Sequence, residues 1–469
     1  MYENDTIAAI SSGLTESGIG IVRVSGPDSY LVAEKIFRKP DGRSADLSVS
    51  NRVHYGFIVD VSRETSESDI VDEVLLINLR APHSYTGEDT VEIDCHGGVL
   101  VMKEILDLLV HNGARLAEPG EFTRRAFLNG RIDLSQAEAV IDVITSKNEK
   151  AMKASVRQLR GSISGKVKEL RSRILHNTAY IEAALDDPEH YSLDDWRDSF
   201  PEDIRMIRTE LRELIESFRY GKLIKEGINT VIIGKPNAGK SSLLNAILGE
   251  ERAIVTKVPG TTRDTINESI SIGGLSLNLM DTAGIRKTDD LVESIGVRRA
   301  LNSIDNADLI LCVIDASAPL DSEDMDILDY IRNKDIKTLF LLNKADLATV
   351  VRTDEILNSM PEDKRECLSI SALTHMGIRE LTKRIEELFS LGDLTYNDEI
   401  TVSSMRHEEQ LIKADSSMES VERSVAEGLP EDFYTVDLMD AYTSLGRIIG
   451  EDVDDDLVNE IFSKFCMGK

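Results

Sequence analysis

The sequence lacks a long apolar run, and no stretch approaches the roughly 20 residues that a membrane-spanning helix needs. Its 469 residues are 41% hydrophobic and 29% charged, which is ordinary for a soluble globular protein. The N-terminal stretch MYENDTIAAISSG has neither the basic start nor the apolar centre of a secretory signal. We therefore expect a soluble protein of the cytoplasm that does not contact a membrane.

Paired cysteines are missing as well. The four cysteines lie far apart in the chain and form no CxxC pair: Cys95, Cys312, Cys367 and Cys466. This spacing argues against a structural zinc site and against a disulfide framework. We expect reduced thiols, and we expect Cys312, inside the apolar run LILCVID, to be an ordinary buried thiol.

Positive charge is scarce, since 54 Lys and Arg residues face 84 Asp and Glu residues, for a formal net charge of −30. This charge argues against broad, nonspecific binding of nucleic acid, because neutralising phosphates requires clustered cations. Any RNA contact must be local. The basic segment 147–173 is one candidate, although a solvated helix face is the simpler explanation of its charge and needs no RNA.

The chain is too long for one hydrophobic core, so we expect several domains. Residues 1–118 alternate short apolar runs with Gly, Pro and Ser turns, which indicates an α+β domain. Residues 119–222 show helical periodicity. Residues 223–391 alternate β-branched strands with helices, as in a doubly wound parallel sheet. Residues 392–469 again indicate helices, so this P-loop domain is predicted to be inserted into a helical domain formed by two pieces of sequence.

A phosphate-binding loop is the strongest motif. The segment GKPNAGKS, from Gly234 to Ser241, matches GxxxxGK[ST] and lies between the apolar strand TVII and the helix SSLLNAIL. Glycines allow the loop to wrap around phosphates, and the helix N-terminus adds positive potential. We expect Lys240 to contact the β- and γ-phosphates and the Ser241 hydroxyl to bind Mg²⁺.

Two further motifs complete the phosphate side of the site. The segment Asp281–Gly284 (DTAG) follows the strand LSLNLM, so its carboxylate can hold the hydration shell of the magnesium ion. Gly284 can approach the γ-phosphate through its backbone. The loop GTTRD between the two motifs is typical of a switch, and we assign Thr262 to Mg²⁺ binding.

Base selection is predicted from NKAD, residues Asn343 to Asp346, after the strand TLFLL. The Asp346 carboxylate can accept both N–H groups of the guanine edge, which adenine does not present. GTP is therefore favoured over ATP. The short strand CLSI is followed by Ser371, Ala372 and Leu373. These residues resemble the loop that lies behind the guanine in P-loop GTPases.

The glutamine that positions the attacking water in Ras-type enzymes is missing, because apolar Ile285 follows DTAG. Another group must position the water. The segment RKTDDLVESIGVRRA offers Asp289, Asp290 and Glu293, and the chemistry of these residues alone does not choose among them.

The motifs together resemble the MnmE/TrmE family of tRNA modification GTPases over essentially the whole chain. The resemblance rests on GIGIVRVSG, HSYTGEDTVEIDCHGG, GEFTRRAFLNGRIDLSQAEAVIDVI, GKPNAGKSSLLN, VPGTTRD, DTAGIRKTDDLVESIGVRRA and the terminal FCMGK, in this order. GRIDLSQAE and the Cys-x-Gly-Lys end are more discriminating than the P-loop motifs, which many GTPases share.

The resemblance implies an N-terminal domain that binds tetrahydrofolate and mediates homodimerisation, a helical domain and an inserted Ras-like G domain. G domains of the family meet face to face when GTP and K⁺ are bound. An FAD-dependent MnmG/GidA protein is the implied partner. The two proteins install an aminomethyl or carboxymethylaminomethyl group at C5 of the wobble uridine in certain tRNAs, with a one-carbon unit from a 5-formyl- or methylene-tetrahydrofolate.

The resemblance also implies individual roles. The catalytic glutamate corresponds to Glu293, and the potassium ligands correspond to Asn237, Thr256, Val258 and Thr261. Folate ligands correspond to Arg23, Glu92, Arg131 and Lys469, where Arg131 stands at a position that is lysine in many relatives. Cys466 is needed for the modification and not for GTP hydrolysis. The full set expected to contact GTP is Asn237, Ala238, Gly239, Lys240, Ser241, Ser242, Thr256, Lys257, Val258, Pro259, Gly260, Thr261, Thr262, Asp281, Thr282, Ala283, Gly284, Asn343, Lys344, Ala345, Asp346, Ser371, Ala372 and Leu373.

The alternative hypothesis is a regulatory GTPase of ribosome assembly, of the Era or EngA type. It predicts a KH-like domain or a second G domain. The sequence contains neither a GXXG in a suitable βαα context nor a second GxxxxGKS. A general ATPase conflicts with NKAD.

Overall fold

The computed structural model describes residues 5–47, 49, 51–60, 70–187, 190, 194–250, 268–272, 275–280, 304–389, 400–453, 455–465 and 468. The chain forms two compact units. One comprises Met1–Ile141, Leu159–His176 and Tyr442–Lys469, and the other comprises Asp142–Gln158 and Asn177–Ala441. The multidomain fold class is confirmed, and the predicted domain boundaries stay predictions.

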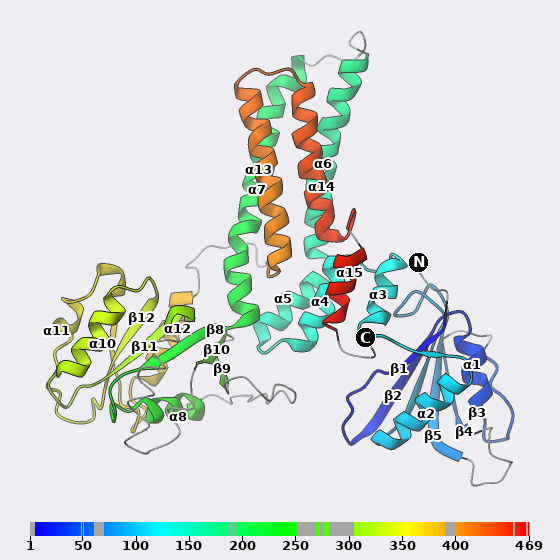
Figure 1. Cartoon of the computed structure of the whole chain (residues 1–469), viewed down its shortest axis with the longest axis horizontal. Helices are drawn as coiled ribbons and strands as arrows, with labels where there is room; N and C mark the ends of the chain where they lie inside the picture. The colour runs from blue at the N-terminus through cyan, green and yellow to red at the C-terminus, as the bar shows by residue number, and fades with distance from the viewer. Residues whose placement is uncertain are drawn as a thin grey trace. The chain divides into compact units, whose positions relative to one another are not determined.

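The first unit contains a seven-stranded sheet of order β3-β4-β5-β6-β2-β1-β7 (Figure 1). Its elements are β1 (Ile7–Ile10), β2 (Ser17–Ser25), α1 (Ser29–Ile36), β3 (Phe37–Arg38), β4 (Arg52–Val59), β5 (Ile70–Leu79), β6 (Thr90–Gly97), α2 (Val99–His111) and β7 (Arg115–Leu116). Alternate residues such as Val22, Val24, Val91 and Ile93 face α1 and α2 and form the core. The residues between them lie on the opposite face, because side chains alternate along a strand.

Short helices join the N-terminal sheet to the C-terminal end of the chain. They are α3 (Glu121–Leu128), α4 (Leu134–Thr145) and α15 (Asp455–Ser463). Leu134 and Ala137 pack with Phe462 and Phe465 in one buried cluster. Gly120 has a φ of 72°, and a Cβ there would lie 2.5 Å from the Phe462 carbonyl oxygen, so only glycine fits this approach.

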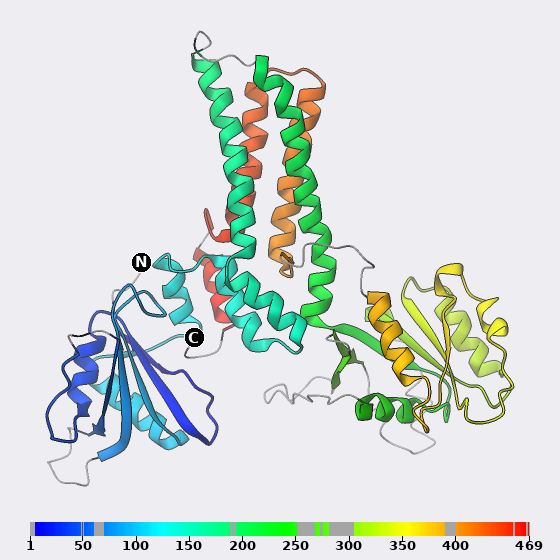
Figure 2. The ribbon, with the colours of Figure 1, turned by 180° about the vertical axis from the view of Figure 1, so that it is seen from behind.

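The second unit contains the helices α5 (Glu149–Leu159), α7 (Asp194–Glu226) and α13 (Met405–Ala426), and the helices α6 (Ser162–Asp186) and α14 (Asp432–Ile449) each belong partly to it. Helices α7 and α13 lie side by side in both ribbon views (Figures 1 and 2). The buried Arg208 on α7 donates to Asp415 of α13 at 3.1 Å and also pairs with Glu422. Trp196 stacks on Phe200, which stacks on Tyr434.

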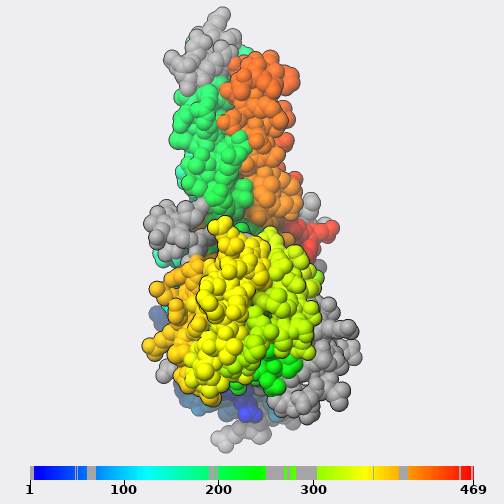
Figure 3. All heavy atoms as spheres, turned by 90° about the vertical axis from the view of Figure 1, so that its left-hand side faces the viewer, coloured from blue at the N-terminus to red at the C-terminus, as the bar shows by residue number. Residues whose placement is uncertain are grey.

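A six-stranded sheet of order β13-β12-β11-β8-β10-β9 completes the second unit. Its elements are β8 (Ile228–Ile233), α8 (Lys240–Glu250), β9 (Glu268–Ile272), β10 (Leu275–Leu279), η3 (Ile304–Asn306), β11 (Leu309–Asp315), α10 (Ser322–Arg332), β12 (Lys337–Asn343), α11 (Thr353–Leu357), η4 (Glu362–Lys364), β13 (Cys367–Ser369) and α12 (Ile378–Phe389). All neighbouring strands are parallel except β9 and β10. Figure 3 shows the atoms of the segments from β11 to α12 packed together, in yellow-green to light orange.

Each face of this sheet is covered by helices, because its strands are apolar on both sides. Leu311 and Val313 face the cluster that includes α8 and α12, whereas Ile310 and Cys312 face the cluster that includes α10 and α11. Cys312 is buried, as expected, and burial raises the pKa of its thiol. The doubly wound arrangement predicted from the strand pattern is therefore confirmed.

Across the described ranges, the helices are all too short or too polar to cross a membrane.

Candidate functional site

The phosphate-binding loop lies at the switch point of the parallel sheet. Strand β8 lies between β10 on one side and β11 on the other, so the order of the strands along the sheet reverses at β8. Ligands of such sheets bind at the carboxyl ends of the strands where the order reverses. Gly234 has a φ of 153°, and a Cβ there would lie 2.2 Å from the carbonyl oxygen of Val313 on β11. Gly239 has a φ of 99°. Glycine is therefore required at both positions.

Two lysines of the loop hold its shape. The Lys240 ammonium donates to the carbonyl oxygens of Gly234 at 2.9 Å and of Lys235 at 2.8 Å. Lys235 in turn donates to Asp324 at 2.7 Å and to Asp321 at 3.0 Å, at the start of α10. Burial lowers the pKa of Lys235, but its hydrogen bonds to Asp324 and Asp321 outweigh this effect and raise the pKa above its ordinary value. Lys235 therefore ties the loop to α10 as a cation.

Asn343, at the end of β12, joins the phosphate loop to the base-selection loops. Its side chain is buried, and its Nδ2 donates to the Ala238 carbonyl oxygen at 2.8 Å. Its Oδ1 accepts from the Ala372 N–H at 2.9 Å. A Cβ at Gly239 would lie 2.1 Å from the same Nδ2. One amide thus fixes two loops that are more than a hundred residues apart in sequence.

The base-selection loop itself is held by Asp346 and Ser371. The Ser371 hydroxyl donates to Asp346 Oδ1 at 2.6 Å and accepts from the Thr374 N–H at 3.2 Å. Ser371 is fully buried, whereas Leu373 is 79% exposed. This hydrogen bond orients one oxygen of the carboxylate and leaves Oδ2 for a ligand.

Lys344 crosses to the end of the neighbouring strand. It has a φ of 65°, and its ammonium donates to Asp315 at 2.6 Å. Burial raises the pKa of Asp315, but hydrogen bonds from Lys344 and Ser317 outweigh this effect and lower the pKa below its ordinary value. The last side chain of β11 and the first side chain after β12 therefore form an ion pair beside the base-selection loop.

The structure brings together the predicted GTP contacts that it describes, namely residues 237–242, 343–346 and 371–373. The predicted contacts from Thr256 to Thr262 and from Asp281 to Gly284 lie outside the described residues, as does Glu293. Asp315 and Lys235 were missed by sequence reasoning. A carboxylate directly after the buried strand LILCVI was a usable signal for Asp315.

A second polar cluster lies on the face of the N-terminal sheet opposite α1 and α2. Arg23 on β2 is paired with Glu92 on β6, and the guanidinium contacts Glu92 Oε1 through Nε and Nη2, both at 2.8 Å. The Tyr85 ring centroid lies 5.0 Å from the Cζ of Arg23 and 5.1 Å from the Cζ of Arg131. Arg131 also donates to the Tyr85 carbonyl oxygen at 2.8 Å. Two of the predicted folate residues, Arg23 and Arg131, therefore lie against one tyrosine, and the third, Glu92, is held by Arg23.

Two atoms of this cluster are buried without a hydrogen-bond partner among the described residues. They are Nη1 of Arg23 and Oδ1 of Asp94, which lies two residues from Glu92 on β6. Burial, with the nearby Glu92 charge, raises the pKa of Asp94. The cluster therefore has two polar atoms whose hydrogen-bonding capacity the described residues leave unused, and a buried polar atom without a partner is costly.

The predicted residues Cys466 and Lys469 lie outside the described part of the chain, but Gly468 is described. It has a φ of 88°, and a Cβ there would lie 2.2 Å from the carbonyl oxygen of Ile10 on β1. Ala9, the residue before Ile10, is paired with Arg23. Gly468 thus lies against β1, which is two strands away from the strand that carries Glu92.

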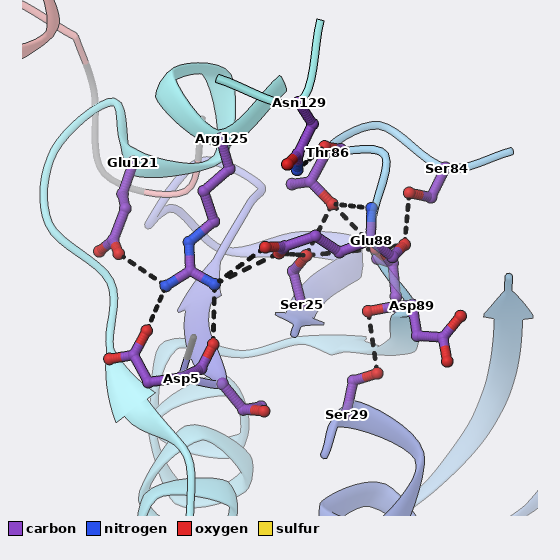
Figure 4. A network of polar contacts seen from close by, with 12 residues as sticks. Asp5, Ser25, Ser29, Ser84, Thr86, Glu88, Asp89, Glu121, Arg125 and Asn129 are labelled. Carbon is purple, nitrogen blue, oxygen red and sulfur yellow. Dashed lines mark hydrogen bonds and ion pairs between the residues drawn. The ribbon is translucent and has the colours of Figure 1, made fainter. Parts of the chain in front are cut away.

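A buried network supports the loop that carries Tyr85 (Figure 4). Arg125 on α3 pairs with Asp5 at 2.5 Å, Glu121 at 3.0 Å and Glu88 at 3.2 Å. Asn129 donates to the Thr86 carbonyl oxygen at 2.8 Å. Tyr85 and Arg125 were not predicted, because their roles depend on contacts between segments that are distant in sequence.

Comparison with known proteins gives two family models that match the chain. The MnmE helical domain matches residues 134–466, and the GTP-binding protein TrmE N-terminus matches residues 6–131. The tRNA modification GTPase MnmE of Lachnoclostridium phytofermentans is 54% identical over 470 residues and covers 100% of both chains. The protein with the same description from Acetivibrio thermocellus is 46% identical over 470 residues, again with 100% of both chains covered.

A solved structure, a point variant of Aquifex aeolicus Era bound to GDP.AlF4-, is 29% identical, with 41% of this chain and 67% of that chain covered and a TM-score of 0.27. The family models and the full-length relatives together cover nearly the whole chain. The chain therefore belongs to the MnmE/TrmE family of tRNA modification GTPases.

Proposed function

We propose that the loops after β8, β12 and β13 bind GTP with Mg²⁺, and that hydrolysis drives a modification at C5 of the wobble uridine of certain tRNAs. The added group is carboxymethylaminomethyl or aminomethyl, and the reaction involves an FAD-dependent MnmG/GidA-type partner. The observation that carries the nucleotide part is the buried Asn343 amide, which joins the phosphate loop to the base-selection loops.

The donors present suit magnesium. Mg²⁺ prefers hard oxygen ligands and usually binds through few protein groups together with phosphate oxygens and water. The Ser241 hydroxyl, at the start of α8, and the Thr262 hydroxyl would hold it, with Asp281 contacting its water. The bound ion would neutralise charge on the β- and γ-phosphates. The described residues contain no group of three or more His, Cys, Asp or Glu side chains that could hold a metal ion, and a hydroxyl-ligated site requires none.

Hydrolysis is assigned to Glu293 and to a potassium ion. The oxygens of Asn237, Thr256, Val258 and Thr261 would surround K⁺, which supplies the positive charge that an arginine finger supplies in other GTPases. Potassium loses its water more readily than sodium and fits a wider ring of oxygens. Wild-type protein should therefore hydrolyse GTP in KCl and not in NaCl, and equal single-turnover rates at matched ionic strength would refute this assignment.

The N-terminal cluster is proposed to bind a reduced folate. A carboxylate such as Glu92 suits the amide edge of a pterin, and the basic Arg23, Arg131 and Lys469 suit the anionic tail. The unpaired Nη1 of Arg23 supports a ligand with an acceptor at this place. Calorimetry should show that 5-formyltetrahydrofolate binds the full-length chain more tightly than residues 1–118, which lack Arg131 and Lys469.

Homodimerisation is proposed through the same face of the N-terminal sheet. Val53, Tyr55 and Leu75 are 61%, 49% and 43% exposed, although they are large and apolar. Tyr55 is paired with Leu75, and Leu75 is paired with Asp94, so this surface continues directly from the folate cluster. Analytical ultracentrifugation of Tyr55→Glu with Leu75→Glu should give a monomer, whereas wild type should give a dimer.

The decisive test of the whole function is mass spectrometry of wobble nucleosides. A strain without this gene should lack the C5 modification, and the wild-type gene should restore it. A displacement assay tests base choice separately, because Asp346→Asn should shift preference from guanosine to xanthosine nucleotides. Equal affinity of the wild type for ATP and GTP would contradict the role of Asp346.

A further inference from the structure

Helix α5 carries positive charge in a chain whose net charge is −30. Residues 142–158 belong to the second unit and contain four basic side chains, Lys147, Lys150, Lys153 and Arg157, which we call the α5 basic stripe. The two acidic residues of the segment are Asp142 and Glu149. Asp142 is buried and pairs with Lys225 at 2.8 Å, so it is already neutralised.

The three basic residues of α5 itself lie on one side of the helix. At about 100° per residue, Lys150, Lys153 and Arg157 fall within an arc of about 60°. Ala151, Ser155 and Gln158 are buried and lie on a different side. Glu149 is exposed and pairs with Lys153 at 2.5 Å. An exposed ion pair of this kind contributes little, so an incoming phosphate can replace Glu149 as the partner of Lys153.

The start of α5 is firmly attached to the six-stranded sheet. The buried Asn148 accepts from the Ala151 N–H at 2.7 Å through Oδ1, which caps the helix. Its Nδ2 donates to the Ile224 carbonyl oxygen on α7 and to the Ser276 hydroxyl on β10, both at 3.0 Å. Ala151 packs in the core cluster of that sheet. The helix that carries Lys150, Lys153 and Arg157 is therefore anchored at its start to the core of that sheet.

We propose that the α5 basic stripe binds the phosphate backbone of the tRNA substrate. The inference rests on the proposed function, which supplies a tRNA. From Lys150 to Arg157 the helix rises about 10 Å, a length along which one strand of a duplex presents about three phosphates at about 3.4 Å each. Such contacts position an RNA without reading its sequence.

The test is equilibrium binding of fluorescently labelled tRNA to the full-length protein with GDP, measured at several NaCl concentrations. The stripe variant is Lys150→Ala, Lys153→Ala and Arg157→Ala. The control variant, Arg205→Ala, Arg212→Ala and Lys413→Ala, removes the same charge from exposed positions on α7 and α13. We expect on the order of tenfold weaker binding for the stripe variant, with a salt slope reduced by about 2 to 3, and near wild-type binding for the control.

A charge-retaining variant, Lys150→Arg with Lys153→Arg, should bind tRNA like wild type, and GTP hydrolysis by all variants reports that they fold. The proposal is overturned if the stripe and control variants lose affinity equally, or if the stripe variant binds tRNA normally. It is also overturned if the stripe variant does not fold and the charge-retaining variant loses tRNA binding. A wild-type protein that binds no tRNA would also overturn this proposal, and the proposed modification would then need the partner protein to hold the tRNA.

Discussion

Replacement of Asn343 tests the join between the two halves of the nucleotide site. Asn343→Ala leaves the Ala238 carbonyl and the Ala372 N–H without their partners, which now lie at 2.8 and 2.9 Å. Each buried, unpaired group costs about 1–3 kcal/mol, so the total is about 2–6 kcal/mol. If a cost of about 2 kcal/mol falls on the conformation that binds nucleotide, the affinity for GDP falls roughly thirtyfold.

Asn343→Asp separates chemistry from shape. The aspartate has almost the same volume and keeps an acceptor for the Ala372 N–H, but it places an oxygen against the Ala238 carbonyl oxygen where Nδ2 now donates. We expect it to bind GDP no better than the alanine variant. Asn333→Ala is the control, because it removes an exposed side-chain hydrogen bond, at 3.2 Å to the Asp329 carbonyl, in the same domain.

The assay is titration with a fluorescent GDP analogue, together with hydrogen exchange of the peptide that contains Ala372. Both Asn343 variants should bind GDP more weakly, and faster exchange at Ala372 is expected in the alanine variant because its N–H loses its acceptor. Wild-type affinity in Asn343→Asp would refute the reasoning, since it would show that the donor at this position contributes nothing.

Four further outcomes are expected. Gly239→Ala should abolish GDP binding in the same titration, because a Cβ would lie 2.1 Å from the Asn343 amide. Asn148→Ala should lower the melting temperature by a few degrees, since three buried hydrogen bonds are lost. Burial raises the pKa of Glu121, but hydrogen bonds from Arg115, the Glu118 N–H and Arg125 lower it below its ordinary value. The stability that ionised Glu121 contributes should therefore be complete above about pH 4.3 and be lost as the pH falls through the folded pKa. Acid unfolding followed by circular dichroism should accordingly be less steep for Glu121→Gln. Cys466→Ser should keep GTP turnover near wild type and lose wobble-uridine modification, and the reverse pattern would contradict that separation.

Features that depend on neighbouring residues in sequence could be predicted. The run TVII followed by GKPNAGKS identifies a strand, a loop and a helix, because apolar periodicity and glycine requirements are local. The structure has β8, the loop and α8 at these residues. The guanine motif was predicted for the same reason, since NKAD directly follows the apolar strand that became β12.

Features that depend on distant pairing could not be predicted. Arg23 and Glu92 meet because β2 pairs with β6 across nearly 70 residues of sequence, and nothing near either residue indicates this pairing. Asn343 was identified as part of NKAD, but its contact with Ala238 follows only from the order of strands in the sheet. The buried position of Arg125 among three carboxylates likewise depends on how α3 packs on the loop 84–90.

The connection between α7 and β8 has a mechanical consequence. The helix has 33 residues, ends at Glu226 and is separated from the central strand only by Gly227. The Asn278 side chain donates to the Glu226 carbonyl oxygen at 2.7 Å, which clamps this joint to β10. At a rise of 1.5 Å per residue the helix is about 50 Å long. A tilt of about 5° at the joint would therefore displace its far end by about 4 Å, a change that spectroscopic distance measurements can detect.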